Sequence, residues 1–410
     1  MGPRLKRGDQ EHLRRLQALS EAFRPAAPID RSTLFAGRTT QLADLFGVVE
    51  QPGQHAIVYG ERGVGKTSLV TVTAGMLDAG DVITARTTCD RSDTFASVWW
   101  KVLDRIHVHI ARPGVGFSAA VQERQVSAAG LLGNDASPYA VTRSLERVSG
   151  ERRVVIFIDE FDRLASDEAR LLFADTIKTL SDQLVQATVV LVGVADTIDE
   201  LITEHQSIER AVVQIHMPRM SSDEVKDIVN RGMEAAQLTI EPAAVDTIAR
   251  LAQGLPHYAH LLGQLAGRIA LDDLRTRVRA DDVAEAVQEA IEKTQQSVLE
   301  AYSRATAETR ATLYPKVVLA CAMARGDEFG FFGSSEVRES LGELAGKSYT
   351  ASSFNRHLDE LTGPERGNVL QKRGGVGSAR YRFGNPLLQP YVLMRGLAEG
   401  AVAPELLRES

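Results

Sequence analysis

Short apolar runs alternate with segments of helically spaced apolar residues through the first half of the chain. Apolar runs of this length, bounded by turn residues, are typical of buried strands. The expected strands cover 56–59, 81–89, 154–158, 188–195 and 212–215. Because strands that alternate with helices usually form parallel sheets, the pattern predicts an α/β domain built on a parallel sheet.

After residue 220 the pattern becomes helical throughout. The expected helices cover 221–236, 241–253, 256–272 and 280–300. Pro256 suits the first position of the third of these, where a missing N–H costs nothing. An α/β domain followed only by helices predicts a helical lid.

The last hundred residues change character again. The expected helices here cover 312–324, 335–344 and 350–361. Two strand-like segments, 368–373 and 378–383, follow and are joined by a glycine-rich turn. Three helices and a hairpin predict a winged-helix domain.

Two remaining segments are less regular. A helix is expected from Gln10 to Phe23, and Pro25 and Pro28 disfavour helix after it. Residues 112–138 are rich in small and polar residues without a period, which predicts a mobile insertion. The expected domains are an N-terminal helix and extended segment (1–30), the α/β core (31–219), the lid (220–303), the winged helix (304–400) and a tail (401–410).

The most specific motif follows the first expected strand and precedes a helix. It has the spacing G-x-x-x-x-G-K-T and therefore predicts a phosphate-binding P-loop. Its glycines let successive N–H groups point at an anion, and the following helix adds its positive end. Lys66 is placed to reach the β- and γ-phosphates, and the Thr67 hydroxyl to bind Mg²⁺. The loop consists of Gly60, Glu61, Arg62, Gly63, Val64, Gly65, Lys66, Thr67 and Ser68.

A second motif ends the third expected strand. Five apolar residues lead into Asp159 and Glu160, a pattern typical of a Walker B motif. Asp159 is placed to hold Mg²⁺ through water, and Glu160 to polarise the attacking water. Asp162 is expected to cap the helix that follows.

The strand 188–195 ends in Asp196 and Thr197. A polar residue at this strand tip, between the P-loop and Walker B strands, is placed to contact the γ-phosphate or the water. Asp196 would be repelled by phosphate unless it bonds through water or to a positive partner. Thr197 is the alternative at this site.

Composition narrows the class of protein. The 410 residues carry a net charge of −7, which is no whole-protein signature of nucleic-acid binding. Locally, however, 366–382 holds five positive residues and no acidic one. Cys89 and Cys321 match no metal spacing, and no apolar run of about 18 residues occurs. We therefore expect a cytoplasmic protein with reduced thiols and no membrane span.

Taken together, these motifs resemble the AAA+ ATPases of the origin-recognition and archaeal initiator type, and more closely their bacterial stand-alone relatives. The resemblance runs from Phe23 to Arg395 and is most specific at 35–38, the P-loop and 158–162. It implies ATP as the nucleotide, Mg²⁺ as the metal, and a homo-oligomer with nucleotide at the subunit interface. Residues Phe35, Gly37 and Arg38 would lie against the adenine, although an ordinary helix-start turn explains them equally well.

The resemblance also assigns roles to single residues. It makes 193–196 the sensor 1 strand end, and Pro256 and His257 the start of the sensor 2 helix. Arg210 would be the arginine finger offered to the neighbouring subunit's γ-phosphate. The alternative for Arg210 is a surface ion pair with Glu209 or Glu204.

Two sensor positions depart from the family pattern. The initiators usually have Arg where this chain has His257, and Asn, Ser or Thr where it has Asp196. A neutral imidazole is a poorer phosphate partner than a guanidinium. The departures imply that hydrolysis is slow, or that His257 only packs.

The first function that fits is an ATP-controlled protein that assembles on double-stranded DNA. Its winged helix would face the major groove with Ser353, Asn355 and Arg356. The wing would contact phosphates or the minor groove with Lys372, Arg373, Arg380 and Arg382. The alternative reading of the wing is a solvated hairpin.

The second function is a regulatory switch. Gly254-Leu255-Pro256 followed by an aromatic residue, and then a winged helix, also resembles the signalling STAND ATPases. In that family the winged helix is a regulatory packing module, so its partner here would be a protein effector. A metabolic kinase fits poorly, since the sequence shows no second substrate pocket.

Overall fold

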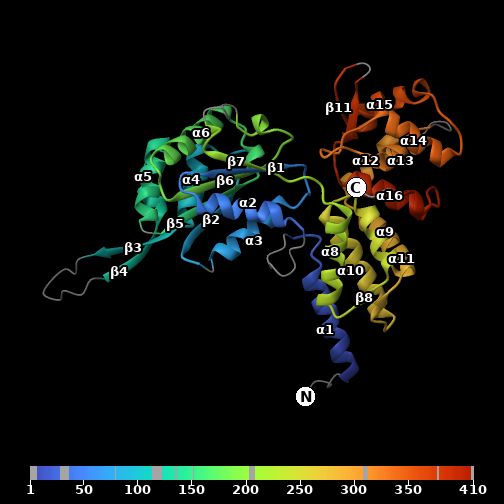
Figure 1. The fold of residues 1–410 in the computed structure, drawn as a ribbon, viewed down its shortest axis with the longest axis horizontal. Helices are drawn as coiled ribbons and strands as arrows, with labels where there is room; N and C mark the ends of the chain where they lie inside the picture. Colours follow the sequence, from blue (N-terminus) through green and yellow to red (C-terminus); the bar gives the residue numbers. More distant parts are fainter. Residues whose placement is uncertain are drawn as a thin grey trace. The chain divides into compact units, whose positions relative to one another are not determined.

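The computed structural model describes residues 7–27, 37–78, 80–112, 122–133, 136–150, 152–202, 208–307, 313–375 and 378–407. The chain divides into two compact units (Figure 1). The core unit consists of Arg38–Glu61 and Lys66–Met217, and the second unit of Met1–Gly37, Arg62–Gly65 and Pro218–Ser410. Within the ranges described, no helix has the length and apolar character needed to cross a membrane.

A five-stranded parallel sheet forms the centre of the core unit. Its strands lie in the order β2-β5-β6-β1-β7, and every neighbouring pair is parallel. This confirms the five expected strands and the parallel sheet. The order places β6 between β1, which leads into the P-loop, and β5, which ends in the Walker B motif. The bounds are β1 His55–Gly60, β2 Val82–Thr88, β5 Arg153–Asp159, β6 Ala187–Val194 and β7 Val212–His216.

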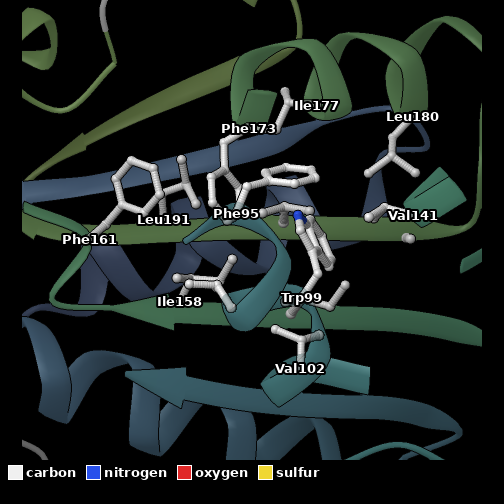
Figure 2. Packing of buried hydrophobic residues seen from close by; sticks show 14 of the residues in the cluster. Phe95, Trp99, Val102, Val141, Ile158, Phe161, Phe173, Ile177, Leu180 and Leu191 are labelled. Carbon is white, nitrogen blue, oxygen red and sulfur yellow. The ribbon is translucent and has the colours of Figure 1, made fainter. Parts of the chain in front are cut away.

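Alternate strand residues point to opposite faces of the sheet, and helices pack against the apolar side chains among them. On one face, Ile158 and Leu191 pack against the aromatic residues Trp99, Phe161 and Phe173 (Figure 2). Helices α4, α5 and α6 supply the cover on that face, whereas α2 and α3 pack on other parts of the sheet. The bounds are α2 Thr39–Glu50, α3 Lys66–Asp78, α4 Phe95–Asp104, α5 Pro138–Ser149 and α6 Asp167–Asp182.

The insertion between α4 and α5 differs from the sequence expectation. Strands β3 (His107–Arg112) and β4 (Gln122–Ser127) form an antiparallel ribbon, and residues 128–131 form a 3-10 turn. Regular elements therefore occupy 122–131 of the expected insertion, whereas its expected mobility stays a prediction. In Figure 1 the ribbon extends away from the sheet of the core unit. Strand β4 is polar apart from Val126 and so lacks the apolar alternation by which strands are recognised, and β3 shows only a short alternation, at Val108 and Ile110.

The second unit begins with α1 (Arg7–Ala22), which packs along α8 and α10. The four expected helices are present, but the fourth ends at Glu292 and a separate helix, α12 (Gln296–Thr306), follows it. A short parallel pair, β8 (Thr239–Ile240) and β9 (Arg277–Val278), joins the loops of this group. The helix bounds are α8 Ser222–Ala235, α9 Pro242–Ala252, α10 Pro256–Asp272 and α11 Ala280–Glu292.

The C-terminal elements contain the three expected helices and the expected hairpin. The third helix begins only at Asn355, because Ala351–Ser353 form a 3-10 turn and Phe354 leaves helical geometry. A short strand that the sequence did not predict, β10, joins the hairpin in the order β10-β12-β11. The winged-helix assignment and the expected domain boundaries stay predictions. The bounds are α13 Tyr314–Met323, β10 Phe332–Gly333, α14 Ser334–Ala345, α15 Asn355–Leu361, β11 Leu370–Arg373, β12 Arg380–Phe383 and α16 Leu388–Ala398.

The strand that leads to the P-loop begins at a buried histidine. The Nδ1 atom of His55 accepts a hydrogen bond of 3.0 Å from the Val189 N–H, so the imidazole fastens the start of β1 to β6. Burial lowers the pKa of His55 from 6.5 to about 4. The folded core unit therefore keeps this imidazole neutral at pH values where an unfolded chain would protonate it.

This burial predicts acid sensitivity. Between pH 6.5 and 4 the unfolded chain binds a proton at residue 55 that the folded chain does not, so stability rises with pH in that window. Up to about 3 kcal/mol is present above pH 6.5 and is lost towards pH 4. We expect His55→Asn, whose side-chain oxygen can accept the same hydrogen bond, to flatten this dependence. Urea unfolding of both proteins at several pH values measures it.

The variant should be less stable at pH 7, by roughly 1–2 kcal/mol, since it leaves part of the buried site unfilled. His260 in the second unit also has a pKa lowered to about 4 by burial, and it contributes equally to both proteins. A pH slope for His55→Asn equal to that of the wild type would contradict the role given to His55.

Candidate nucleotide-binding site

The P-loop has the backbone conformation that its glycines predict. Gly63 and Gly65 have φ angles of 90° and 98°, which residues with a Cβ rarely adopt. Strand β1 ends at Gly60 and α3 begins at Lys66, so the loop connects a buried strand to a helix N-terminus. A helix N-terminus preceded by such a loop offers backbone N–H groups to an anion.

Lys66 holds a positive charge at this loop. Its Nζ atom donates hydrogen bonds to the carbonyl oxygens of Gly60 at 2.9 Å and Glu61 at 2.8 Å. The residue is buried, so the ammonium is held by its own loop rather than by water. The arrangement presents a fixed cation beside backbone donors, which suits a phosphate group.

The two predicted metal ligands meet. The Thr67 hydroxyl donates a 2.8 Å hydrogen bond to Oδ2 of Asp159, although 92 residues separate them. The other carboxylate oxygen of Asp159 accepts a 2.8 Å hydrogen bond from the Glu160 N–H. A hydroxyl and a carboxylate at one point are the hard oxygen ligands that Mg²⁺ prefers beside nucleotide phosphates. The residues present therefore fit a Mg²⁺–nucleotide site.

Glu160 occupies a strained position. Its φ of 53° lies in the left-handed region, which is uncommon for a residue with a side chain. The carboxylate is 42 % exposed and lies 3.2 Å from the Arg163 guanidinium. The side chain is therefore at the rim of the core unit, next to the buried Asp159.

The expectation that Asp162 caps the next helix is wrong. The Ser166 hydroxyl caps α6 by accepting a hydrogen bond from the Ala169 N–H at 3.1 Å. Asp162 instead accepts a 2.8 Å hydrogen bond from the Val194 N–H, at the end of β6. Its side chain thus joins the Walker B turn to the neighbouring strand, a partner that local sequence could not reveal.

The predicted sensor on β6 lies at the same edge of the sheet. Asp196 is buried two residues beyond the strand, and its N–H donates a 2.9 Å hydrogen bond to the Glu200 carboxylate. Thr197, the alternative, is exposed. Because β6 lies between β1 and β5, both residues are close in the sheet to the strand ends that carry the other site residues.

Of the remaining predicted nucleotide contacts, Arg210, Gly37 and Arg38 lie within the described residues. Arg210 is exposed in the turn before β7, and no ion pair joins it to Glu209 in the described part of the chain. The other suggested partner, Glu204, lies outside the described residues, as does Phe35. Gly37 and Arg38 both have positive φ angles, and buried Arg38 precedes α2.

His257 has a partner that the sequence did not suggest. Helix α10 begins at Pro256, as predicted, and the Nδ1 atom of His257 lies 2.8 Å from the Pro25 carbonyl oxygen. Because a carbonyl only accepts hydrogen bonds, Nδ1 must carry the proton. The N-terminal segment therefore fixes the orientation of the imidazole at the start of this helix.

The same segment is anchored by Phe23. Its ring is fully buried between α8 and α10, where a Cβ on Gly232 would lie 2.3 Å from the ring and one on Gly263 would lie 2.5 Å from it. The Phe23 carbonyl accepts a 2.9 Å hydrogen bond from Gln264. Two glycines thus form the notch that seats the segment holding His257.

The predicted base-reading residues lie at the start of α15. The Ser353 hydroxyl donates a 2.6 Å hydrogen bond to the Thr350 carbonyl, and Asn355 is half-buried. The Arg356 side chain is 87 % exposed and pairs with Glu360 at 2.7 Å. Of these three, Arg356 is the residue most open to a partner.

The predicted wing cations are largely paired within the C-terminal elements. Lys372 contacts Asp359 at 2.6 Å, which raises the lysine pKa, and Arg380 contacts Asp327 at 3.4 Å. The guanidinium groups of Arg373 and Arg382 lie over the Phe331 ring, at 4.9 and 4.6 Å. The acidic partners come from outside 366–382. The surface around this run therefore carries less positive charge than the sequence of the run suggests.

A buried polar cluster also joins the α8–α11 helices to the C-terminal elements. The Arg219 guanidinium donates to the Gln389 side-chain oxygen at 2.5 Å, and the Gln389 amide donates to Gln253 at 3.1 Å. Nearby, the Tyr258 hydroxyl donates to the Leu387 carbonyl at 2.7 Å. Gln253 and Tyr258 flank the start of α10, so that helix start is tied to α16.

The fold and the site define a P-loop NTPase with an AAA+-like fold. Residues 22–325, well over half of the chain, match the family model described as Novel STAND NTPase 1. The chain therefore belongs to the novel STAND NTPase 1 family. Among the curated proteins, none matches this chain.

Two solved structures share this AAA+ fold. The ORC1 protein of Aeropyrum pernix, in complex with DNA, is 20% identical with a TM-score of 0.50, covering 92% of this chain and 95% of its own. A Walker-type ATPase of Pyrococcus abyssi is 15% identical with a TM-score of 0.52, covering 90% and 98%. At these identities the likeness concerns the fold alone.

The notch formed by Gly232 and Gly263 predicts that a single added methyl group lowers the stability of the protein. Alanine normally stabilises a helix relative to glycine by up to about 1 kcal/mol. In Gly232→Ala the new Cβ would overlap the Phe23 ring, so we expect a net loss of about 1–3 kcal/mol and faster chymotrypsin cleavage after Phe23. Urea unfolding and timed proteolysis measure the two effects.

Gly342→Ala in α14 is the matched control, because the nearest atom to its Cβ would be 3.5 Å away. This variant should be neutral or slightly more stable. Equal stability and equal cleavage of the two variants would show that Phe23 does not need the notch.

Proposed function

We propose that this protein binds and hydrolyses ATP at the P-loop, and that its nucleotide state controls assembly and the C-terminal elements. The observation that carries the proposal is the 2.8 Å contact between Thr67 and Asp159. This contact joins the Walker A hydroxyl to the Walker B carboxylate. The residue before Thr67, Lys66, holds its ammonium against the carbonyl groups of the P-loop. Phosphoryl transfer requires mainly such positioning and charge stabilisation.

In this proposal the site residues have separate roles. The P-loop N–H groups and Lys66 bind the phosphates, and Thr67 and Asp159 hold Mg²⁺, which neutralises phosphate charge when bound. Glu160 orients and polarises the attacking water. Exposed Arg210 serves the γ-phosphate of a neighbouring copy, so that hydrolysis depends on assembly into a homo-oligomer.

Slow turnover follows from the two altered sensors. His257 is held by the Pro25 carbonyl, and its imidazole gives a phosphate less charge than a guanidinium would. Asp196 is an anion at a position where a γ-phosphate would be repelled. The site is thus better suited to holding ATP than to rapid cycles.

The polar cluster at the start of α10 supports a regulatory switch as the function that the nucleotide state controls. Arg219, Gln253 and Gln389 form buried hydrogen bonds that connect this helix start to α16. Buried polar networks fix one arrangement, because each group left without a partner costs free energy. In this proposal a change at the start of α10 is passed to the C-terminal elements, which bind a protein effector.

Binding to double-stranded DNA is the second candidate for the function that the nucleotide state controls. The observation in its favour is the exposed basic strand β11, with Lys372 and Arg373, near exposed Arg356. The pairing of Lys372 and Arg380 with carboxylates reduces the charge available to phosphates. In this reading the C-terminal elements act as a winged helix that grips the DNA backbone.

Two substitutions test the ATPase proposal. Lys66→Ala removes the phosphate-binding cation, and we expect nucleotide binding to be lost. Glu160→Gln keeps the shape of the side chain but not its charge, and we expect ATP binding to persist while turnover falls about 100-fold or more. Fluorescent-nucleotide titration and phosphate release measure the two steps.

Glu168→Gln, on the exposed first turn of α6, is the matched control and should turn over ATP as the wild type does. Wild-type turnover by Glu160→Gln would contradict the role of Glu160. Nucleotide binding by Lys66→Ala at wild-type affinity would contradict the assignment of the P-loop.

Reversing the charges of the wing cations decides between DNA and a protein as the partner. If DNA is the partner, changing Lys372, Arg373, Arg380 and Arg382 to Glu should abolish a gel shift at matched salt and leave ATPase activity largely intact. If the partner is a protein, the wild type should shift no DNA but should change mass with nucleotide in light scattering.

The matched control reverses four exposed cations of the core unit, Arg91, Arg105, Arg147 and Arg152. It equals the wing variant in net charge. A gel shift that is lost equally in both variants would show a non-specific charge effect and would count against DNA binding by the wing.

A further inference from the structure

We propose that Arg170 of α6 is a positioning residue for nucleotide hydrolysis, which holds the turn carrying Glu160 at a fixed place relative to the turn carrying Asp196. The inference rests on the proposed ATPase function. It adds a residue that belongs to none of the sequence motifs. Arg170 forms an ion pair with Asp167 at 3.8 Å, and its contacts with the two turns are hydrogen bonds to backbone carbonyl groups.

The Arg170 guanidinium binds the carbonyl groups of both turns. Its Nε and Nη2 atoms donate to the Leu164 carbonyl at 3.1 and 2.8 Å, and Nη2 also lies 3.4 Å from the Asp162 carbonyl. On the other side, Nη1 donates to the Glu200 carbonyl at 3.3 Å. The planar group has donors in fixed directions, so one side chain joins 162–164 to 200.

Two further hydrogen bonds connect the same turns. The Asp162 carboxylate accepts from the Val194 N–H at 2.8 Å, and the Glu200 carboxylate accepts from the Asp196 N–H at 2.9 Å. Asp162 thus binds the end of β6, while Glu200 binds Asp196 and is itself held by Arg170 through its carbonyl. The Walker B turn and the sensor turn are therefore joined as one hydrogen-bonded assembly.

The helix that carries Arg170 also supports the Walker B turn from inside the core. Phe173 lies three residues further along α6, on the same face, and its ring packs edge-to-face on Phe161 at 5.1 Å (Figure 2). Phe161 directly follows Glu160 and is fully buried. Helix α6 therefore holds the turn at two points, through Phe173 in the core and through Arg170 nearer the surface.

This support matters because Glu160 has an unfavourable backbone conformation. Left-handed geometry at a residue with a Cβ persists only where the surroundings hold it. The ion pair of Glu160 with Arg163 is half-exposed, and such pairs contribute little. The Arg170 side chain is 19 % exposed and makes four hydrogen bonds to carbonyl groups, so it is the stronger constraint.

The test compares Arg170→Gln and Arg170→Lys with Lys178→Gln, which removes an exposed cation from the same helix, as control. We expect Arg170→Gln to lower kcat by about tenfold to a hundredfold, because small misplacements of a reacting group carry that cost. The nucleotide Kd should change less than about threefold, since the P-loop is untouched. Arg170→Lys should recover only part of the rate, because an ammonium lacks the several fixed donors of a guanidinium. Lys178→Gln should stay near wild type.

The double variant Arg170→Gln/Glu160→Gln separates positioning from a general structural effect. If Arg170 acts through Glu160, its loss should lower the rate little further once Glu160 is absent. An equal fold-loss in both backgrounds, or a parallel loss of nucleotide binding, would overturn the proposal. If Arg170→Gln does not fold, a wild-type kcat for Arg170→Lys would overturn it.

Failure of the proposed function gives a different result. In that case Glu160→Gln alone would turn over ATP as the wild type does, whatever Arg170→Gln shows. If Glu160→Gln is inactive and Arg170→Gln has a wild-type kcat, the ATPase assignment stands and only the role of Arg170 is wrong.

Discussion

The hydrogen bond between Thr67 and Asp159 is the constraint on which the candidate site depends. It exists because β1 and β5 lie on either side of β6 in a parallel sheet, so that their carboxyl ends share one edge. Each partner comes from a buried strand or from the helix that follows one, and neither can move without disturbing the core. The P-loop, the Walker B turn and the end of β6 are all positioned by the same three strands.

Around this contact, residues outside the motifs decide how the motif residues are held. Arg170 binds the carbonyl groups of Asp162 and Leu164, close to Glu160, and the Pro25 carbonyl binds His257. In both places a residue with a predicted chemical role takes its orientation from a distant segment. Preorganisation of this kind, rather than the identity of the reacting group alone, sets how well a site stabilises charge.

In the C-terminal elements, the charge of the surface differs from the charge of the sequence run that forms part of it. Residues 366–382 contain only positive charges, yet Asp327 and Asp359 lie against Arg380 and Lys372. The field that a partner meets is therefore weaker than the run suggests. At the same time, the buried bonds of Gln389 connect these elements to the start of α10.

From sequence alone, the five sheet strands, most of the helices, the P-loop and the Walker B carboxylates could be predicted, because each depends on spacing or periodicity within a short stretch. The β3–β4 ribbon was missed, since β4 has a single apolar residue besides its polar ones and β3 has only a short apolar alternation. The partners of Asp162 and His257, and the part played by Arg170, were decided by tertiary structure. Sheet order and helix packing bring these residues together, although Pro25 and His257, for example, are 232 positions apart in the sequence. No local sequence pattern indicates such a pairing.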